Sequence, residues 1–155
     1  MAKSKTHDNL IYLTTPLIVI GSTYVSQILS INQNIYIPLM TFMYIVGGLY
    51  LSPDLDIVST PYNRWHFLKF IWLPYQKWIK HRSIFSHGII IGTTLRLFYL
   101  SFIIGIVVST ISNNNILNFY FNLYDFLSKY YIYSLSSFIS IELSSICHII
   151  ADLKH

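Results

Sequence analysis

The chain has 155 residues, of which 54% are hydrophobic and only 10% are charged, and its formal net charge is +4. Soluble domains carry about 25% charged residues, so this composition excludes an ordinary soluble domain and favours a protein that contacts lipid. The small positive charge is better explained as a membrane-topology signal than as a nucleic-acid-binding surface, and we expect no nucleic-acid partner. The single cysteine, Cys147, excludes an intrachain disulfide, and we expect it to be a small buried side chain.

Apolar stretches in four places predict membrane-spanning helices. Each comes close to the roughly 20 residues that an α-helix needs to cross the hydrocarbon core of a bilayer. A tight turn is expected at Asn32–Asn34, and Pro53 should end the second helix because proline lacks the backbone N–H donor. The sequence therefore predicts an all-α integral membrane protein with one transmembrane domain over residues 1–155 and helices at about 10–31, 35–51, 88–111 and 130–151.

Two further stretches mix aromatic residues with polar ones. Residues 62–80 contain all three tryptophans together with lysine and arginine, and Pro74 divides them. We expect one or two amphipathic helices in the lipid headgroup layer, because tryptophan and basic side chains both favour that layer. The alternative is an ordinary cytosolic loop, which would leave the tryptophans in water. Residues 116–127 predict a second interfacial helix.

Four crossings of the membrane place the scattered polar motifs on one side. The N-terminal arm, the segment between the second and third helices and the C-terminal end all lie on the side of the N-terminus. Most lysine and arginine residues are there too, so the positive-inside rule assigns both termini to the cytoplasm or to the stroma of a plastid. The polar residues brought to this face are His7, Asp8, Asp54, Asp56, His81, His87, His148 and Asp152.

The residues on that face include the types that bind divalent metal ions, because imidazole nitrogen and carboxylate oxygen hold such ions at about 2.0–2.2 Å. Asp54 and Asp56 share one turn, and His148 and Asp152 share one face of a helix, one turn apart. His87 opens the third helix, and His7 reaches over from the arm. We expect one divalent ion (Zn, Mn or Fe) or a two-metal site, with the candidate ligands His7, Asp54, Asp56, His87, His148 and Asp152.

Each of these signals has a purely structural alternative. The turn at Asp54 can be a helix cap, His81 can face lipid headgroups, and His148 can be a packing residue. Ionisable groups inside a membrane are nevertheless functional candidates by default, and their joint occurrence on one face favours a site. His66 and His155 have no partners by spacing, and we expect both at the surface.

Two charged residues lie deeper within the third and fourth predicted helices. At about 1.5 Å per residue, Arg96 lies roughly 13 Å beyond His87 and Glu142 roughly 9 Å before His148. The sequence favours an ion pair between Arg96 and Glu142, because a lone charge at that depth costs at least about 2.5–3.5 kcal/mol. In the alternative, Glu142 contacts the metal ligands without binding the metal, or it accepts a proton beneath the metal.

Four motifs together carry a resemblance to a known family: THD at 6–8, SPDLD at 52–56, HRSIFSHG at 81–88 and HIIAD at 148–152. With the run WLPYQKWIKHRS, the chain resembles, nearly end to end, a family of small membrane proteins described as metal-binding proteins of unknown function and common in cyanobacteria. That family is related to the YdjM-like membrane-bound metal-dependent hydrolases. The resemblance implies a hydrolase activity and metal binding by His7, Asp54, Asp56, His87, His148 and Asp152.

Three functions compete on this basis. The first is a metal-dependent hydrolase that cleaves a lipid or another ester or phosphoester at the membrane surface, with His81 as the catalytic acid–base residue. The second is a non-catalytic structural or assembly subunit of a larger membrane complex, which would use the aromatic stretches as contact surfaces. A photosynthetic complex in the thylakoid or another plastid membrane would fit a composition rich in Ile, Asn, Tyr, Lys and Ser. The third, a metal transporter, is disfavoured because the candidate ligands lie near one face. The expected partners are membrane lipid and, in the second case, other subunits.

Overall fold

The computed structural model describes residues 4–153, and no β-strand occurs among them. The all-helical class predicted from the sequence is therefore confirmed. Four helices are long and apolar enough to cross a membrane, and these are α1, α2, α6 and α8. The elements in chain order are α1 (Ser4–Ile28), α2 (Gln33–Tyr50), the 3-10 helix η1 (Pro53–Asp56), α3 (Thr60–Arg64), the 3-10 helix η2 (His66–Trp72), α4 (Leu73–Trp78), α5 (Ile84–His87), α6 (Ile91–Ser112), α7 (Ile116–Lys129) and α8 (Tyr131–Leu153).

Polar residues set the ends of several helices. The side chain of Asn32 accepts a hydrogen bond from the backbone N–H of Asn34 and so caps the start of α2. That helix ends at Tyr50, and Pro53 opens η1, as expected from the missing N–H of proline. At the other hairpin, Asn113 ends α6 in the left-handed conformation, and the side chain of Asn115 caps α7. The asparagine-rich stretches therefore act as turns between helices.

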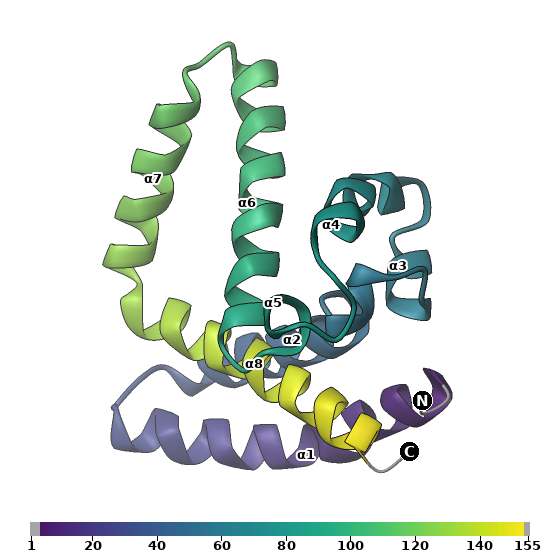
Figure 1. Cartoon of the computed structure of the whole chain (residues 1–155). Helices are drawn as coiled ribbons and strands as arrows, with labels where there is room; N and C mark the ends of the chain where they lie inside the picture. The colour runs from purple at the N-terminus through teal and green to yellow at the C-terminus, as the bar shows by residue number, and fades with distance from the viewer. Residues whose placement is uncertain (1–3, 154–155) are drawn as a thin grey trace.

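Helices α1, α2 and α8 pack on one another and form the base of the molecule (Figure 1). Two adjacent glycines near the end of α2 allow this close packing. A Cβ atom on Gly47 would lie 2.4 Å from Ser144 Oγ of α8, and one on Gly48 would lie 2.5 Å from Ile11 Cδ1 of α1. Small residues of this kind let helix backbones approach closely. The end of α2 is therefore held between the first half of α1 and the middle of α8.

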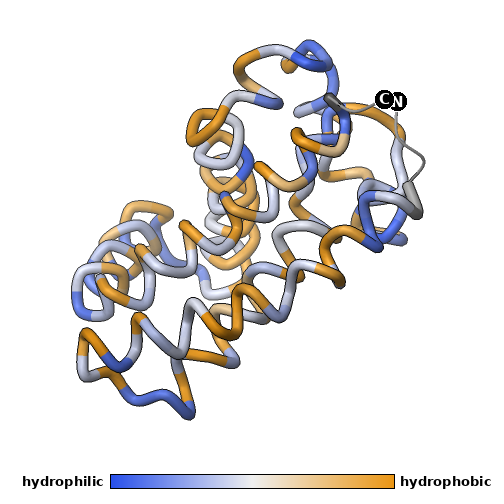
Figure 2. The backbone as a smooth tube through the Cα atoms, turned by 90° about the horizontal axis from the view of Figure 1, so that it is seen from below, coloured by the Kyte–Doolittle hydropathy of each residue, from blue (hydrophilic) through white to orange (hydrophobic). Residues whose placement is uncertain are grey.

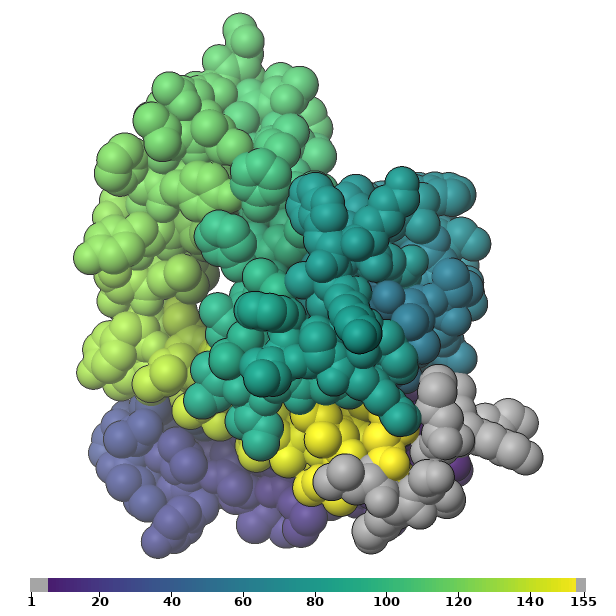
Figure 3. Space-filling model, viewed as in Figure 1, coloured from purple at the N-terminus to yellow at the C-terminus, as the bar shows by residue number. Residues whose placement is uncertain are grey.

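The third long helix, α6, does not lie beside the other three. It rises from the base with α7 as a hairpin and runs across the direction of α1 and α8 (Figure 1), and the hairpin stands clear of the base in the space-filling view (Figure 3). Hydrophobic residues recur along every long helix, whereas hydrophilic residues gather at turns and near the chain ends (Figure 2). On α1, for example, Leu13, Leu17 and Ile20 are each at least 66% exposed.

The aromatic segment 62–80 differs from the predicted interfacial helix in two ways. It forms three short helices, α3, η2 and α4, with a break at Trp65 as well as the change of helix near Pro74. Its aromatic side chains also divide between the interior and the surface. Trp72 is fully buried and packs on Tyr99 of α6, with ring centroids 5.6 Å apart, whereas Trp78 is 76% exposed. The segment thus supplies part of the core. The second predicted interfacial stretch, 116–127, lies within the single helix α7, which has no buried residue.

Candidate metal centre

Four elements from distant parts of the sequence meet at one end of the base. The start of α1 supplies His7, and η1, directly after α2, supplies Asp54 and Asp56. Helix α5 ends on His87, and the last two turns of α8 carry His148 and Asp152. The structure therefore brings all six candidate ligands to one region. The helix order predicted this convergence, because α1 and α6 begin where α2 and α8 end.

Four of these residues form a compact set: Asp54, His87, His148 and Asp152. One nitrogen or oxygen of each lies within 4.8 Å of the corresponding atom of every other member. His148 Nε2 is 3.4 Å from Asp54 Oδ2 and 3.7 Å from Asp152 Oδ2, and His87 Nε2 is 3.6 Å from Asp54 Oδ1. Asp54 and His148 are buried, and the other two are half-buried. This is a donor set with which divalent Zn, Mn and Fe are commonly bound.

The unsatisfied atoms of the set support a metal ion between them. His87 Nε2, His148 Nε2, Asp54 Oδ1 and Asp152 Oδ1 are all buried and lack a hydrogen-bond partner. Buried polar atoms are normally hydrogen-bonded, so several unpartnered nitrogen and oxygen atoms that face one another need an explanation. A cation that accepts lone pairs from all four residues would satisfy them together. The residues present therefore fit a divalent metal.

Two serines contact the second ring nitrogen, Nδ1, of His148 and His87. Ser52 Oγ lies 3.2 Å from His148 Nδ1, and Ser86 Oγ lies 2.9 Å from His87 Nδ1. If each Nδ1–H donates to its serine, both Nε2 atoms carry free lone pairs that point at the carboxylates. Metal-binding histidines usually donate their second ring N–H in this way. Sequence reasoning assigned no role to Ser52 and Ser86, although both lie within its motifs, directly before Pro53 and His87.

Asp56 and His81 form a neighbouring pair. Asp56 Oδ1 lies 2.9 Å from His81 Nδ1, and Asp56 Oδ2 lies 3.8 Å from His87 Nδ1. Asp56, His81 and His87 make a second group of potential ligands. However, the His87 nitrogen that lies 3.8 Å from Asp56 is Nδ1, which Ser86 Oγ already contacts at 2.9 Å. We therefore assign the metal to the set of four and treat Asp56 and His81 as a hydrogen-bonded pair beside it.

Four further ionisable residues, His7, Asp8, Arg64 and Arg82, lie around this centre. His7 stacks on His148, with ring centroids 4.0 Å apart, and His7 Nε2 lies 3.4 Å from Asp152 Oδ1. Arg82 approaches Asp152 from outside at 3.9 Å. Asp8 pairs with Arg64 of α3 and so ties the start of α1 to the segment after η1. Of the two histidines expected at the surface, His66 is exposed and His155 lies outside the described residues.

The predicted ion pair between Arg96 and Glu142 is wrong. The Arg96 guanidinium instead donates to the Ser86 carbonyl oxygen and to the hydroxyls of Thr93 and Ser145. Glu142 Oε1 accepts the backbone N–H of Ile90. The sequence gives the position of each residue along its helix. It does not give the direction in which the side chain points, and an ion pair depends on that direction.

Two further side chains in this region, Tyr75 and Cys147, lie outside the ligand set. Burial raises the pKa of Tyr75 to about 12, so its phenol stays protonated near Arg96. Cys147 is half-buried and accepts a hydrogen bond from the Tyr44 hydroxyl. Neither belongs to the ligand set.

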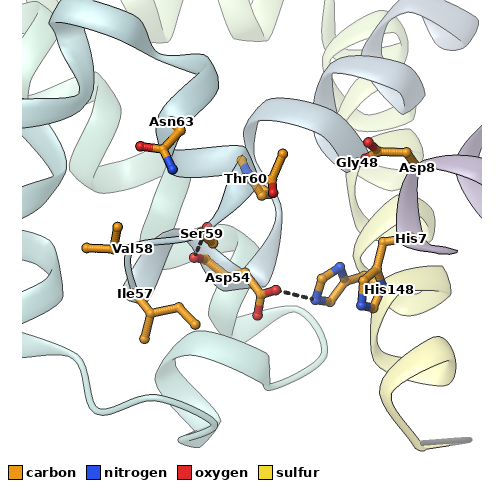
Figure 4. Close-up of a pocket in the computed structure, with 11 residues that line it drawn as sticks. His7, Asp8, Gly48, Asp54, Ile57, Val58, Ser59, Thr60, Asn63 and His148 are labelled. Carbon is orange, nitrogen blue, oxygen red and sulfur yellow. Dashed lines mark hydrogen bonds and ion pairs between the residues drawn. The ribbon is translucent and has the colours of Figure 1, made fainter. Parts of the chain in front are cut away.

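A cavity of about 280 Å³ opens beside two of the four residues, Asp54 and His148. His7, Asp54 and His148 line one side, and the chain between η1 and α3 lines the other. Figure 4 shows Asp54 pointing across to His148, with the His7 ring beside it and with Thr60 and Asn63 on the neighbouring backbone. Water at liquid density occupies about 30 Å³ per molecule, so the cavity has room for a small polar group next to the metal-binding atoms.

The fold and the site are those of a helical protein with a candidate metal centre. The comparison with family models agrees: residues 2–155 match the family described as "Uncharacterized metal-binding protein (DUF2227)", and the chain belongs to that family. A curated protein of Aquifex aeolicus (strain VF5), described as "Uncharacterized protein", is 48% identical over 58 residues. That match covers 37% of this chain and only 40% of the relative's length. No solved structure matches the chain significantly.

Proposed function

We propose that this protein is an integral membrane hydrolase that binds one divalent metal ion through Asp54, His87, His148 and Asp152. The observation that carries the proposal is the set of buried, unpartnered nitrogen and oxygen atoms that face one another beside a cavity. When bound there, a divalent ion would activate a water molecule and polarise the bond to be cleaved. An ester or phosphoester is the substrate class that such chemistry serves.

The location of the centre supports a substrate at the membrane surface. Its ligands sit at the ends of four long apolar helices rather than along their middles. If α1, α2 and α8, which pack on one another, insert, the centre lies near the headgroup layer, where lipid esters and phosphoesters are found. The positive charge concentrated at this end would then place it on the cytoplasmic or stromal side. Protease protection of both termini tests this orientation, and termini on opposite sides would contradict it.

The chain's own residues supply the remaining roles. The 2.9 Å contact between Asp56 Oδ1 and His81 Nδ1 orients the His81 imidazole, whose side chain is 30% exposed. His81 Nε2 is then the atom that would give a proton to, or take one from, the reacting group. Thr60 and Asn63, which line the cavity, offer hydrogen bonds to a polar headgroup. The partner in this proposal is membrane lipid.

The test combines metal content with hydrolysis of esters and phosphoesters in lipid vesicles. We expect His87→Ala to lose both the metal and the activity. We expect His81→Ala to keep the metal and to lose about 10²–10⁴-fold in rate, the usual contribution of a general acid or base. Wild-type protein that binds no metal would contradict the hydrolase, and unchanged activity in His81→Ala would contradict only the role of His81.

A second candidate is a structural or assembly subunit of a larger membrane complex, and helix α7 favours it. Leu117, Phe121 and Tyr124 recur along one face of α7 and are 58%, 67% and 68% exposed. Such an uncovered apolar face is suited to another membrane subunit as well as to lipid. Replacing Phe121 and Tyr124 with serine should then release the chain from a large detergent-solubilised assembly and leave its metal content unchanged. Wild-type protein that migrates as a single chain would contradict this function.

A further inference from the structure

The connection between α5 and α6 holds its backbone in a strained conformation directly after the ligand His87. Ile90 has φ 67° and ψ −52°, and the Ile91 N–H donates to the Ile89 carbonyl oxygen at 2.8 Å. These values describe a γ-turn with positive φ at its centre, which is rare and strained. A β-branched residue rarely adopts positive φ. Surrounding groups must therefore hold this turn in place.

Arg96 holds the chain on the side that precedes His87. Its Nη1 donates to the Ser86 carbonyl oxygen at 2.8 Å, which belongs to the peptide bond that leads into His87. Its Nη2 donates to Thr93 Oγ1 at 2.8 Å and to Ser145 Oγ at 3.0 Å, so the guanidinium is anchored on both α6 and α8. Arg96 is 1% exposed. Hydrogen bonds from a charged donor are about twice as strong as neutral ones.

Glu142 holds the chain on the side that follows His87. Its Oε1 accepts the N–H of Ile90, the central residue of the strained turn, at 3.0 Å. Glu142 is 7% exposed and lies on α8, the helix that also carries His148. Helix α8 therefore carries His148 itself and also holds the backbone after His87 through the Glu142 carboxyl group.

We propose that Arg96 and Glu142 form a buried clamp on the two sides of His87 and are positioning residues of the metal centre. The clamp sets the distance between the His87 and His148 imidazoles by tying the His87 turn to α6 and α8. Two buried ionisable side chains with no direct ion pair between them do not favour stability over well-packed apolar residues. Their placement on the peptide groups around a ligand gives them a role. This inference rests on the metal centre proposed above.

The test measures Co²⁺ binding by absorption spectroscopy in the full-length protein in lipid nanodiscs. We expect Arg96→Met and Glu142→Leu to bind Co²⁺ about 10–100-fold more weakly, as do variants of other groups that orient ligands, and to show an altered Co²⁺ spectrum. Glu142→Gln keeps an oxygen that can accept the Ile90 N–H and should restore near-wild-type binding. Arg96→Lys keeps the positive charge but not the two-pronged set of N–H donors. Its Co²⁺ affinity should lie between those of the wild type and Arg96→Met.

Tyr99→Phe is the matched control, because it removes a buried hydrogen bond from α6 to the Ile71 carbonyl oxygen, away from His87. It should lower the melting temperature without changing the Co²⁺ affinity or spectrum. A second readout, which needs no metal, is hydrogen exchange of the Ile90 amide, and this should accelerate in Glu142→Leu relative to Glu142→Gln. If Arg96→Met does not fold, Arg96→Lys and the two Glu142 variants still test the clamp.

The outcomes separate the clamp from the centre on which it rests. Folded Glu142→Leu and Arg96→Lys with wild-type Co²⁺ affinity, spectrum and Ile90 exchange would overturn the clamp and leave the metal centre standing. Wild-type protein that does not bind Co²⁺ would overturn the metal centre and the positioning role together.

Discussion

Replacing Ser52 with alanine tests whether the contact between Ser52 and His148 supports metal binding. Ser52 is fully buried, and its Oγ lies 3.2 Å from His148 Nδ1. When His148 Nε2 binds a metal, the ring proton must be on Nδ1, and Ser52 is its acceptor. Ser52→Ala leaves that donor buried without a partner, at a cost of about 1–3 kcal/mol. Without metal the proton can move to Nε2 beside Asp54, so the cost falls mainly on the metal-bound state.

We therefore expect Ser52→Ala to bind metal about 10–100-fold more weakly, a range typical for the partners of ligating histidines. The assay is competition with a chelator of known affinity at neutral pH. Ser140→Ala is a matched control. Ser140 is a buried serine on α8, about two turns before His148. Its hydroxyl contacts the sulfur of Met40 at 3.4 Å. It should not change the metal affinity. A folded Ser52→Ala protein with wild-type affinity would refute the assigned histidine tautomer.

Three further predictions concern the core, the helix packing and the protonation of the ligands. Trp72→Ala, at a fully buried site, should lower the free energy of unfolding in detergent by about 3–5 kcal/mol, and an unchanged value would contradict the aromatic core. Gly47→Val should destabilise by about 1–3 kcal/mol, since its Cβ would lie 2.9 Å from the Ile141 Cα, whereas Gly21→Val, with nothing within 4 Å, should not. Lowering the pH from about 7 to about 5 should release the metal, because protonated imidazole has no lone pair to bind it. Binding that does not change with pH would contradict the histidine ligands.

The convergence of the candidate ligands could be predicted from the sequence because it depends only on the order of the helices. Apolar runs mark four long helices, and alternating directions bring the start of α1 and the ends of α2 and α8 together. The glycine pair Gly47-Gly48 reinforces this by close packing. The order of the helices brings these ends together whether or not the helices are parallel. The convergence therefore occurs although α6 runs across the others.

The details of the contacts could not be predicted in this way. Helical spacing gives the depth of Arg96 and Glu142 but not the rotation of each helix, so the predicted ion pair was wrong. The strained turn at Ile90 has no signal in the sequence, because isoleucine is unfavourable at positive φ. Burial of Trp72 depends on α6 standing over η2, which is a tertiary arrangement. Composition therefore predicts a surface location for that segment, whereas packing buries Trp72 and leaves Trp78 exposed.

The most direct test of the central claim is the metal content of purified protein, measured for the wild type and for the double variant His87→Ala, His148→Ala. We predict about one divalent ion per wild-type chain and none in the double variant, with both proteins folded by circular dichroism. Wild-type protein without bound metal, after loading with Zn²⁺, Mn²⁺ and Fe²⁺ in turn, would contradict the account. Equal metal content in the two proteins would contradict the assigned ligands.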